Sequence, residues 1–347
     1  MIDFAYSPTP NGCKVGIMLE ACGLDCERGI RMKIGTKMLW LATCLIATAL
    51  CTTSTAVAEG AADTGAVTVV DELQFPEAPL FVNDQLHWVE YISNRLMRLD
   101  GETRTVLHEQ EGCGHNGLSL SPKKQLVVIC YESNEILYLD LDGNVVERID
   151  ADLNGEPFNH PNDIVFTDEG GAYITTSGPF VAEAKQIVGG VYFRGPGAAG
   201  FVEVANDVHF GNGIVVINDG NTLLVSEHNA NRILSFDIAD DGTLSNRQLF
   251  VRMTDMMPGP AQPSIWLGPD GMKVDSQGNI YVAHYMGGHV VKMSSEGEFL
   301  QSFEIPGIAV TNLTFYPDDS SMYVAAVEDV TGPPYHGSIW KIDLNEQ

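Results

Sequence analysis

Residues 268–283 read GPDGMKVDSQGNIYVA, and they carry both a folding signal and a chemical signal. A polar segment, residues 275–279 (DSQGN), separates two runs in which apolar and polar residues alternate. This arrangement is typical of a β-hairpin. Just ahead of the first strand, Asp270 stands between Pro269 and Gly271, so the sequence predicts a carboxylate held in a stiff turn.

The same pattern recurs along the chain: an apolar strand, a turn rich in Asp, Gly, Asn or Pro, a second strand, a polar gap and a third strand. The six copies lie at residues 80–89, 118–128, 164–175, 214–226, 272–283 and 313–325. A period of about 45 residues is the period of a propeller blade with four strands. The sequence therefore predicts an all-β fold, a six-bladed β-propeller with four-stranded antiparallel blades in a single domain.

A propeller needs its two chain ends to share one blade. Residues 66–70 (AVTVV) form a short apolar run that could pair with residues 338–343 (SIWKID) near the C-terminus. We expect this pairing to complete the sixth blade.

The N-terminal segment does not follow the blade pattern. Lys33 and Lys37 precede an apolar run at residues 38–50, and residues 56–58 (AVA) offer a cleavage site of small residues. These features predict a secretory signal peptide over residues 32–58, cleaved near Ala58, and hence an exported protein without a membrane span. Residues 1–31 fit no pattern and are expected to be an upstream extension, which leaves residues 59–347 for the propeller.

Two of the seven cysteines, Cys113 and Cys130, lie beyond the expected cleavage site. Export would permit a disulfide between them. Cys130 also ends an apolar strand pattern, where a buried free thiol is common. The sequence leaves both interpretations open.

The chain is strongly acidic. It has 347 residues with 19 Lys and Arg against 46 Asp and Glu, for a formal net charge of −27. Such a surface repels phosphate backbones and anionic lipids, so we expect no nucleic acid partner.

Each copy is preceded by a polar side chain with an oxygen donor. Inner strands of a propeller line a central channel, so residues just ahead of them can converge from distant parts of the sequence. The six residues are Glu77, Asn116, Asn162, Asn212, Asp270 and Asn312. Two carboxylates and several amides suit a hard cation, with Ca²⁺ expected ahead of Mg²⁺, Mn²⁺ or Zn²⁺. The sequence therefore predicts one divalent metal ion in the central channel.

These motifs resemble those of the gluconolactonase, regucalcin and senescence-marker-protein family of six-bladed propellers. The matching segments are residues 75–77 (FPE), 160–163 (HPND), 211–214 (GNGI), 269–272 (PDGM) and 311–312 (TN). The resemblance covers about residues 70–345. It implies that Glu77, Asn162, Asn212 and Asp270 bind the metal ion and that Asp270 also serves as the general base.

Two features depart from the family pattern. His160 stands where the family often has an arginine that helps to hold sugar acids, which weakens the case for an aldonolactone. Residues 253–267 form a long apolar segment that includes Trp266. This segment is either a lid that makes the pocket mouth apolar or a loop packed on the neighbouring blade.

Histidines offer a second source of proton transfer, because a metal-bound carboxylate is a weak base. His115, His160 and His209 precede inner strands, and His284 ends a second strand. Of these, His160 is the first candidate for a catalytic role. We expect substrate contacts from Asn116, His115, His160, Asn312 and Trp266.

The leading hypothesis is an exported, metal-dependent lactonase that opens a neutral sugar lactone or small organic lactone with an activated water. One alternative is a hydrolase of phosphotriesters or aryl esters of the paraoxonase type. A second alternative, from a different class, is a metal-containing propeller that binds a ligand without catalysis.

Overall fold

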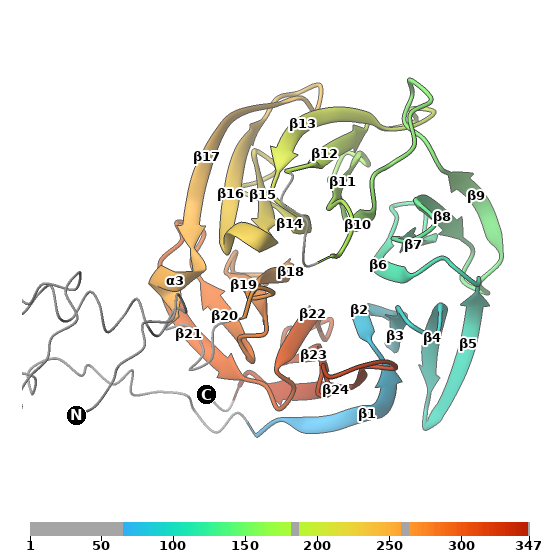
Figure 1. The fold of residues 1–347 in the computed structure, drawn as a ribbon, viewed down its shortest axis with the longest axis vertical. Helices are drawn as coiled ribbons and strands as arrows, with labels where there is room; N and C mark the ends of the chain where they lie inside the picture. The colour runs from blue at the N-terminus through green and yellow to red at the C-terminus, as the bar shows by residue number, and fades with distance from the viewer. Residues whose placement is uncertain (1–64, 182–186, 258–263, 346–347) are drawn as a thin grey trace, which may run out of the picture. The chain divides into compact units, whose positions relative to one another are not determined.

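The computed structural model describes residues 65–181, 187–257 and 264–345. These residues form six antiparallel sheets of four strands each, arranged as the blades of a propeller (Figure 1). The predicted six-bladed β-propeller is confirmed. The expected signal peptide and the upstream extension lie outside the described residues.

Blades 1 to 3 follow one another along the chain. Blade 1 contains β2 (Pro76–Val82), β3 (Gln85–Glu90), β4 (Arg95–Asp100) and β5 (Thr103–Glu109). Blade 2 contains β6 (His115–Leu120), β7 (Leu126–Cys130), β8 (Glu135–Leu139) and β9 (Val145–Ile149). Blade 3 contains β10 (Pro161–Phe166), β11 (Ala172–Thr176), β12 (Gly189–Arg194) and β13 (Val202–Val208).

Blades 4 to 6 complete the circle. Blade 4 contains β14 (Gly211–Ile217), β15 (Thr222–Glu227), β16 (Arg232–Ile238) and β17 (Leu244–Arg252), with the short helices η1 (His228–Ala230) and α3 (Met253–Met256). Blade 5 contains β18 (Gly268–Val274), β19 (Ile280–Tyr285), β20 (His289–Met293) and β21 (Phe299–Glu304). Blade 6 contains β22 (Ala309–Phe315), β23 (Ser321–Val327), β24 (His336–Asp343) and β1 (Val67–Gln74).

The sixth blade closes the ring with strands from both ends of the described chain. β1 pairs with β24 in antiparallel register, from Val67 opposite Lys341 to Gln74 opposite His336. In Figure 1 the blue β1 lies beside the red β24. The predicted pairing of residues 66–70 with residues 338–343 is confirmed.

The hydrophobic core consists of clusters between adjacent blades. Between blades 5 and 6, for example, the cluster includes Tyr281, Phe303 and Trp340. Equivalent clusters lie between the other neighbouring pairs of blades. Each fully buried side chain of this size contributes about 1.5–3 kcal/mol relative to an exposed one. The blades are therefore held together by apolar packing, and polar side chains remain available for the channel.

The first strands of the blades, β2, β6, β10, β14, β18 and β22, contact one another in sequence around the centre (Figure 1). In each of them the pairing register with the second strand is interrupted near its start, for example between Glu77 and Leu80 and between Pro269 and Met272. Such bulges redirect side chains and are common beside active sites. The prediction that Asp270 precedes its strand is wrong, because β18 begins at Gly268 and Asp270 lies at the bulge within it.

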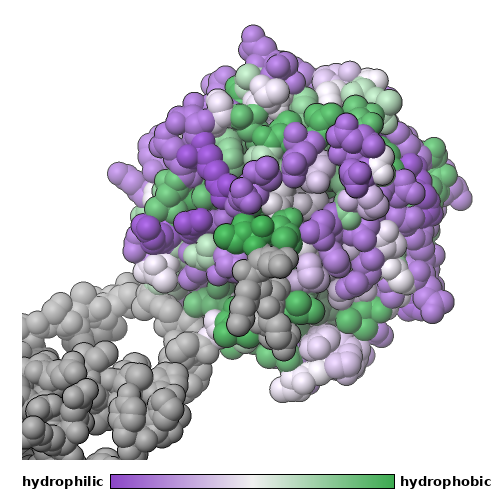
Figure 2. Space-filling view, turned by 45° about the horizontal axis from the view of Figure 1, so that its top comes forward, coloured by the Kyte–Doolittle hydropathy of each residue, from purple (hydrophilic) through white to green (hydrophobic). Residues whose placement is uncertain are grey.

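The visible face in Figure 2 is mostly hydrophilic, in keeping with the acidic composition, and apolar residues form separate patches on it. Among the described residues, no helix has the length and apolar composition that crossing a bilayer requires.

Candidate active site

A cavity of about 530 Å³ opens at the end of the channel where the first strands begin and the second strands end. Its wall includes five polar residues from the bulges of β2, β6, β10, β14 and β18. These residues are Glu77, Asn116, Asn162, Asn212 and Asp270, which we call the polar floor. The structure thus brings all four expected metal ligands to one cavity, together with two of the expected substrate contacts, Asn116 and Trp266.

The two carboxylates of the polar floor are deeply buried. Glu77 is 5% exposed and Asp270 is 6% exposed. Burial raises the pKa of both carboxyl groups, and repulsion from Asp270 and Asp163 adds to the rise at Glu77. A hydrogen bond from the Asn212 amide opposes the rise in the pKa of Asp270. Two buried like charges are costly unless a counter-charge accompanies them.

The amide groups of the polar floor are oriented by hydrogen bonds. The Asn162 Nδ2 atom donates to the Ser177 hydroxyl at 3.0 Å, and the Asn116 Nδ2 atom donates to the backbone carbonyl of Asn162 at 3.1 Å. Since the nitrogen end of each amide is occupied in this way, the oxygen end is the one available to a cation or substrate.

Buried hydroxyl groups hold the backbone of the polar floor from the preceding blade. The Thr175 hydroxyl donates to the Asn212 carbonyl at 2.6 Å, and the Ser226 hydroxyl donates to the Asp270 carbonyl at 2.9 Å. Thr311 on β22 donates to the Pro76 carbonyl at 2.8 Å, which joins the last blade to the first. Adjacent blades are therefore locked in register at the residues that carry the site.

Three glycines of the bulges are required by close approach. A Cβ atom on Gly213 would lie 2.3 Å from the Asp270 carbonyl oxygen, and one on Gly117 would lie 2.6 Å from the Asn162 carbonyl oxygen. A Cβ atom on Gly271 would meet the Asn312 side chain at 2.2 Å. Taken alone, each Asn-Gly pair indicates only a turn, but here the glycine lets the next blade pack against the bulge.

Three expected site residues do not line the cavity. His115 is fully buried, and its ring lies 5.6 Å from that of His108 on β5. His160 is not among the lining residues, and its ring lies 4.9 Å from that of Tyr131, which does line the cavity. The Asn312 Oδ1 atom accepts hydrogen bonds from the Leu313 N–H at 2.9 Å and from the Lys273 ammonium at 3.3 Å.

Two side chains in or near the site, Lys273 and His228, were not singled out from the sequence. The positive charge of Lys273 lowers the pKa of Glu77 and of Asp163, so it partly compensates the buried carboxylates. His228 follows β15 and lines the cavity, where its Nε2 atom contacts the Trp266 carbonyl at 3.0 Å. Burial lowers the pKa of His228 to about 4, so its imidazole is neutral at pH 7. Its position at the end of a second strand was the available signal.

The upper wall of the cavity is aromatic, which the sequence suggested only through Trp266. Its members lie just before first strands, at or just after the ends of second strands, or in neighbouring loops. We call this group the aromatic belt: Phe75, Tyr91, Tyr131, Phe180, Phe210, His228, Trp266, Tyr285 and Tyr335. The Trp266 ring lies 4.2 Å from the Phe180 ring, at an angle of 40° to it, and both residues line the cavity. The described part of the 253–267 segment therefore contributes to the cavity wall.

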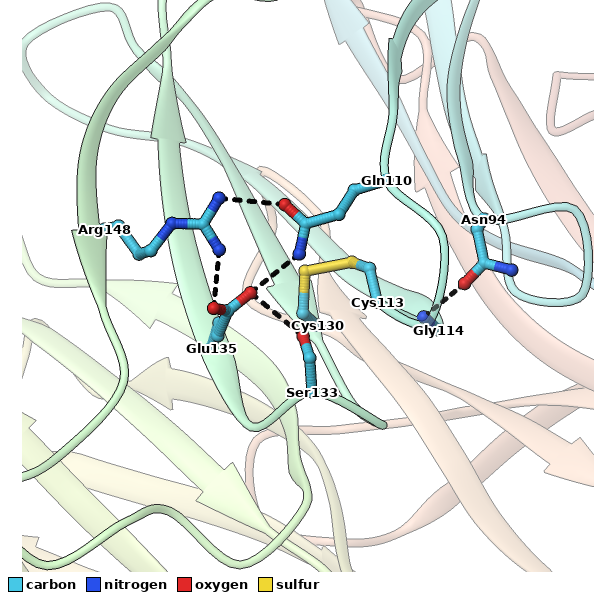
Figure 3. The surroundings of a disulfide bond; sticks show 8 residues. All are labelled: Asn94, Gln110, Cys113, Gly114, Cys130, Ser133, Glu135 and Arg148. Atoms are coloured by element: carbon cyan, nitrogen blue, oxygen red, sulfur yellow. Dashed lines mark hydrogen bonds and ion pairs between the residues drawn. A yellow bond between two sulfur atoms is a disulfide. The ribbon is translucent and has the colours of Figure 1, made fainter.

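A disulfide bond lies close in sequence to two of the residues that line the cavity. Cys113 is joined to Cys130, which settles the choice between a bridge and free thiols (Figure 3). Around it, Gln110, Ser133 and Arg148 all bind the Glu135 carboxylate, and Asn94 accepts a hydrogen bond from the Gly114 N–H at 2.7 Å. The bridged residues precede Asn116 and Tyr131 by three positions and one position. The bridge therefore tethers the segments that carry a floor residue and a belt residue.

The polar floor fits a hard divalent cation. It combines two carboxylates with amide oxygens, the donor types that Ca²⁺ prefers, and a set of four protein donors leaves coordination positions for water and substrate. Within the described residues, no group of three or more His, Cys, Asp or Glu side chains is arranged to hold a metal. The donor set therefore depends on amides, and a cation there would offset the repulsion between the buried carboxylates.

The SMP-30/gluconolactonase/LRE-like family matches this chain over residues 75–328. The chain belongs to this family. The matched region includes blades 1 to 5 and the first two strands of blade 6, β22 and β23, and it contains every residue of the polar floor.

Several relatives are lactonases by name. Lactonase drp35 of Staphylococcus saprophyticus is 28% identical over 212 residues, which are 57% of this chain and 61% of the relative. Pentonolactonase XacC of Haloferax volcanii is 28% identical over 252 residues, which are 72% of this chain and 80% of the relative. This chain therefore matches less than two thirds of the drp35 relative's length.

Solved structures share the propeller fold. The gluconolactonase XC5397 of Xanthomonas campestris superposes with a TM-score of 0.65 at 23% identity, covering 84% of this chain and 93% of that protein. The calcium-binding protein regucalcin of Agrobacterium tumefaciens superposes with a TM-score of 0.63 at 20% identity, covering 78% of this chain and 90% of that protein. At these identities the likeness concerns the fold.

Proposed function

We propose that this protein is a metal-dependent lactonase whose active site is the polar floor. The observation that carries the proposal is the pair of buried carboxylates, Glu77 and Asp270, set among oriented amides at the end of a 530 Å³ cavity. The lactonase names of the relatives support the reaction class, and the calcium-binding description of the Agrobacterium protein supports the cation.

Glu77, Asn162, Asn212 and Asp270 would hold the cation, with Ca²⁺ favoured by the oxygen donors. When bound, such an ion polarises a lactone carbonyl and favours negative charge on its oxygen. Asn116 lies on the same floor, where its amide can orient the lactone ring.

Asp270 is the first candidate for the group that accepts the proton of the attacking water. Its carboxylate is buried at the cavity wall, and the Ser226 hydroxyl fixes its backbone. His228 replaces His160 as the histidine candidate, since His228 lines the cavity and His160 does not. Its lowered pKa makes the imidazole a weak base, so we place Asp270 ahead of it.

We also propose that the protein is exported. The apolar segment at residues 38–50 with its preceding lysines supports export. The buried Cys113–Cys130 disulfide supports it as well, because such bridges persist in oxidising compartments.

The test compares proton release from γ- and δ-lactones by the wild-type protein and by Asp270→Asn, with Ca²⁺ present. We expect Asp270→Asn to lose at least about 100-fold in kcat, the size of effect typical of general acid–base groups. Asp343→Asn, at the exposed end of β24, is the matched control and should retain full activity. Wild-type protein that binds Ca²⁺ but opens no lactone would instead indicate a binding propeller.

A further inference from the structure

The aromatic belt forms an almost unbroken series of ring contacts around the cavity mouth. One arm runs Trp266–Phe180–Phe210–His228–Tyr285 with ring centroids 4.2, 5.7, 5.5 and 5.6 Å apart. The other arm runs Tyr285–Phe75–Tyr91–Tyr131 with centroids 6.5, 5.5 and 6.0 Å apart, and Tyr335 packs on Phe75 at 5.9 Å. These residues come from all blades, so the belt is built by the whole propeller.

A hydrogen bond links the Tyr131 end of this series to the loop that carries Phe180. The Tyr131 hydroxyl donates to the Gly178 carbonyl at 2.6 Å, two residues before Phe180. The Tyr91 hydroxyl is likewise directed at protein, where it donates to the Glu132 carboxylate. These two of the four tyrosine hydroxyls of the belt are used within the protein, so on the Tyr91–Tyr131 side the belt offers a substrate ring faces and edges.

Charge is confined to the bottom of the cavity. Among the described residues that line it, Glu77 and Asp270 are the only Asp or Glu, and there is no Lys or Arg. An anionic sugar acid or phosphate would meet no cationic side chain in the belt. A polyhydroxylated ring would lose hydrogen bonds to water and regain few from these side chains.

We propose that the aromatic belt selects an uncharged lactone whose carbonyl ring is fused to a flat, apolar ring. This inference rests on the proposed lactonase function for its reaction and on the belt for its substrate class. The carbonyl reaches the polar floor while the apolar ring stacks against the belt. Stacking on aromatic side chains stabilises a bound planar ring more than a bound flexible or hydroxylated ring.

Phe180 and Trp266 are the specificity-determining pair. They make the closest ring contact of the belt, at 4.2 Å, and they come from different blades, one in the loop after β11 and the other just before β18. Phe180 is 42% exposed although it lines the cavity. Its ring is therefore open to solvent at the cavity wall, where a bound substrate can cover it.

The experiment measures kcat/KM for a benzo-fused δ-lactone, an alkyl δ-lactone and a sugar δ-lactone. Variants are Phe180→Ala, Trp266→Ala and Trp266→Phe. The control is Phe299→Ala, which removes an equally exposed phenylalanine (46%) from β21, away from the cavity. In parallel, binding of 2-tetralone, a ketone that cannot be hydrolysed, is measured by calorimetry.

We expect the wild-type protein to prefer the benzo-fused lactone. Each alanine variant should lose about 10-fold in kcat/KM for that lactone, mostly through KM, and much less for the sugar lactone. Trp266→Phe should retain most of the activity, and Phe299→Ala should match the wild type. Binding of 2-tetralone should weaken in parallel with these changes.

Two results separate this inference from the function on which it rests. The proposed substrate class is wrong if the protein hydrolyses the sugar lactone better than the benzo-fused lactone, or if neither Phe180→Ala nor Trp266→Ala changes kcat/KM. In either case the lactonase function still stands. Binding of 2-tetralone that depends on both residues, without hydrolysis of any lactone, supports the ligand class and overturns the lactonase. Absence of both ketone binding and benzo-lactone turnover overturns the inference.

Discussion

The hydroxyl of Ser226 on β15 donates a 2.9 Å hydrogen bond to the backbone carbonyl of Asp270 on β18, in the next blade. Both residues are buried. This bond fixes the backbone of the proposed general base from outside the cavity. The Thr175 hydroxyl holds the Asn212 carbonyl of the following blade in the same way.

Ser226→Ala should therefore weaken the site without removing any of its donors. We expect about a 10-fold loss in Ca²⁺ affinity, the lower end of the range for groups that orient metal ligands. The loss of one buried hydrogen bond should also cost about 1 kcal/mol of unfolding free energy. Calorimetric Ca²⁺ titration and urea unfolding measure the two effects.

The matched control for that change is Ser338→Ala. Ser338 is also buried, and its hydroxyl donates to Glu328 in blade 6, which does not line the cavity. It should lose a similar amount of stability but keep the wild-type Ca²⁺ affinity. Equal losses of affinity in the two variants would mean that Ser226 has no special role in positioning Asp270.

Gly213→Ala should damage both folding and function. The added Cβ atom would lie 2.3 Å from the Asp270 carbonyl oxygen, so one of the two blades must shift. Overpacking of this kind costs about 1–3 kcal/mol. Thermal unfolding and lactone turnover are the measurements. Gly332→Ala is the control, because its Cβ would meet nothing within 4 Å, and a comparable loss there would refute the steric explanation.

Removal of the disulfide should lower the free energy of unfolding but change kcat little. It closes a loop with a sequence separation of 17, and such a bridge is worth about 3 kcal/mol. We expect the double variant Cys113→Ala, Cys130→Ala to lose stability of this order in urea unfolding. Because the bridge tethers the segments that carry Asn116 and Tyr131, KM should rise while kcat changes little. A fall in kcat alone would contradict this role.

His115 should make the protein sensitive to acid. Burial lowers the pKa of this histidine from 6.5 to about 3, and both ring nitrogens lack hydrogen-bond partners. The unfolded chain therefore binds a proton below pH 6.5 that the folded chain does not. The stability contributed by the neutral ring is present above pH 6.5 and is lost as the pH falls toward 3.

His115→Leu tests this prediction. At pH 5 the protonation of His115 in the unfolded chain should cost the wild type about 2 kcal/mol relative to pH 7.5. Between pH 7.5 and pH 5 the free energy of unfolding of the variant should fall by about 2 kcal/mol less than that of the wild type. Urea unfolding at both pH values measures the difference. Its stability at pH 7.5 serves as the internal reference. An unchanged pH dependence would show that the buried imidazole does not control it.

The features that recur in every blade could be predicted from the sequence. The turn at residues 275–279 and the pairing of the chain ends follow from local patterns that the structure retains. The convergence of Glu77, Asn162, Asn212 and Asp270 followed from their equivalent positions in successive copies. The bulges were not foreseen, because their register shift depends on pairing between strands rather than on local sequence.

The sequence did not show which side chains near the strand ends point into the cavity. His115 and Asn116 are neighbours, yet Asn116 lines the cavity and His115 packs between strands, since successive residues of a strand point to opposite sides. The aromatic belt was also missed, because its residues share only a place at strand ends. Tyr91, Tyr131 and His228 each follow directly after a second strand, a position that the blade pattern marks but does not explain.

The most direct test of the account is lactone hydrolysis by the wild-type protein after chelation and again after Ca²⁺ is restored. We expect the stripped protein to remain folded and to release no acid from the lactone panel above background. Added Ca²⁺ should restore turnover in proportion to the occupied sites. Full activity in the stripped protein would contradict a cation held by Glu77 and Asp270, and so would Ca²⁺ binding that survives Glu77→Gln and Asp270→Asn together.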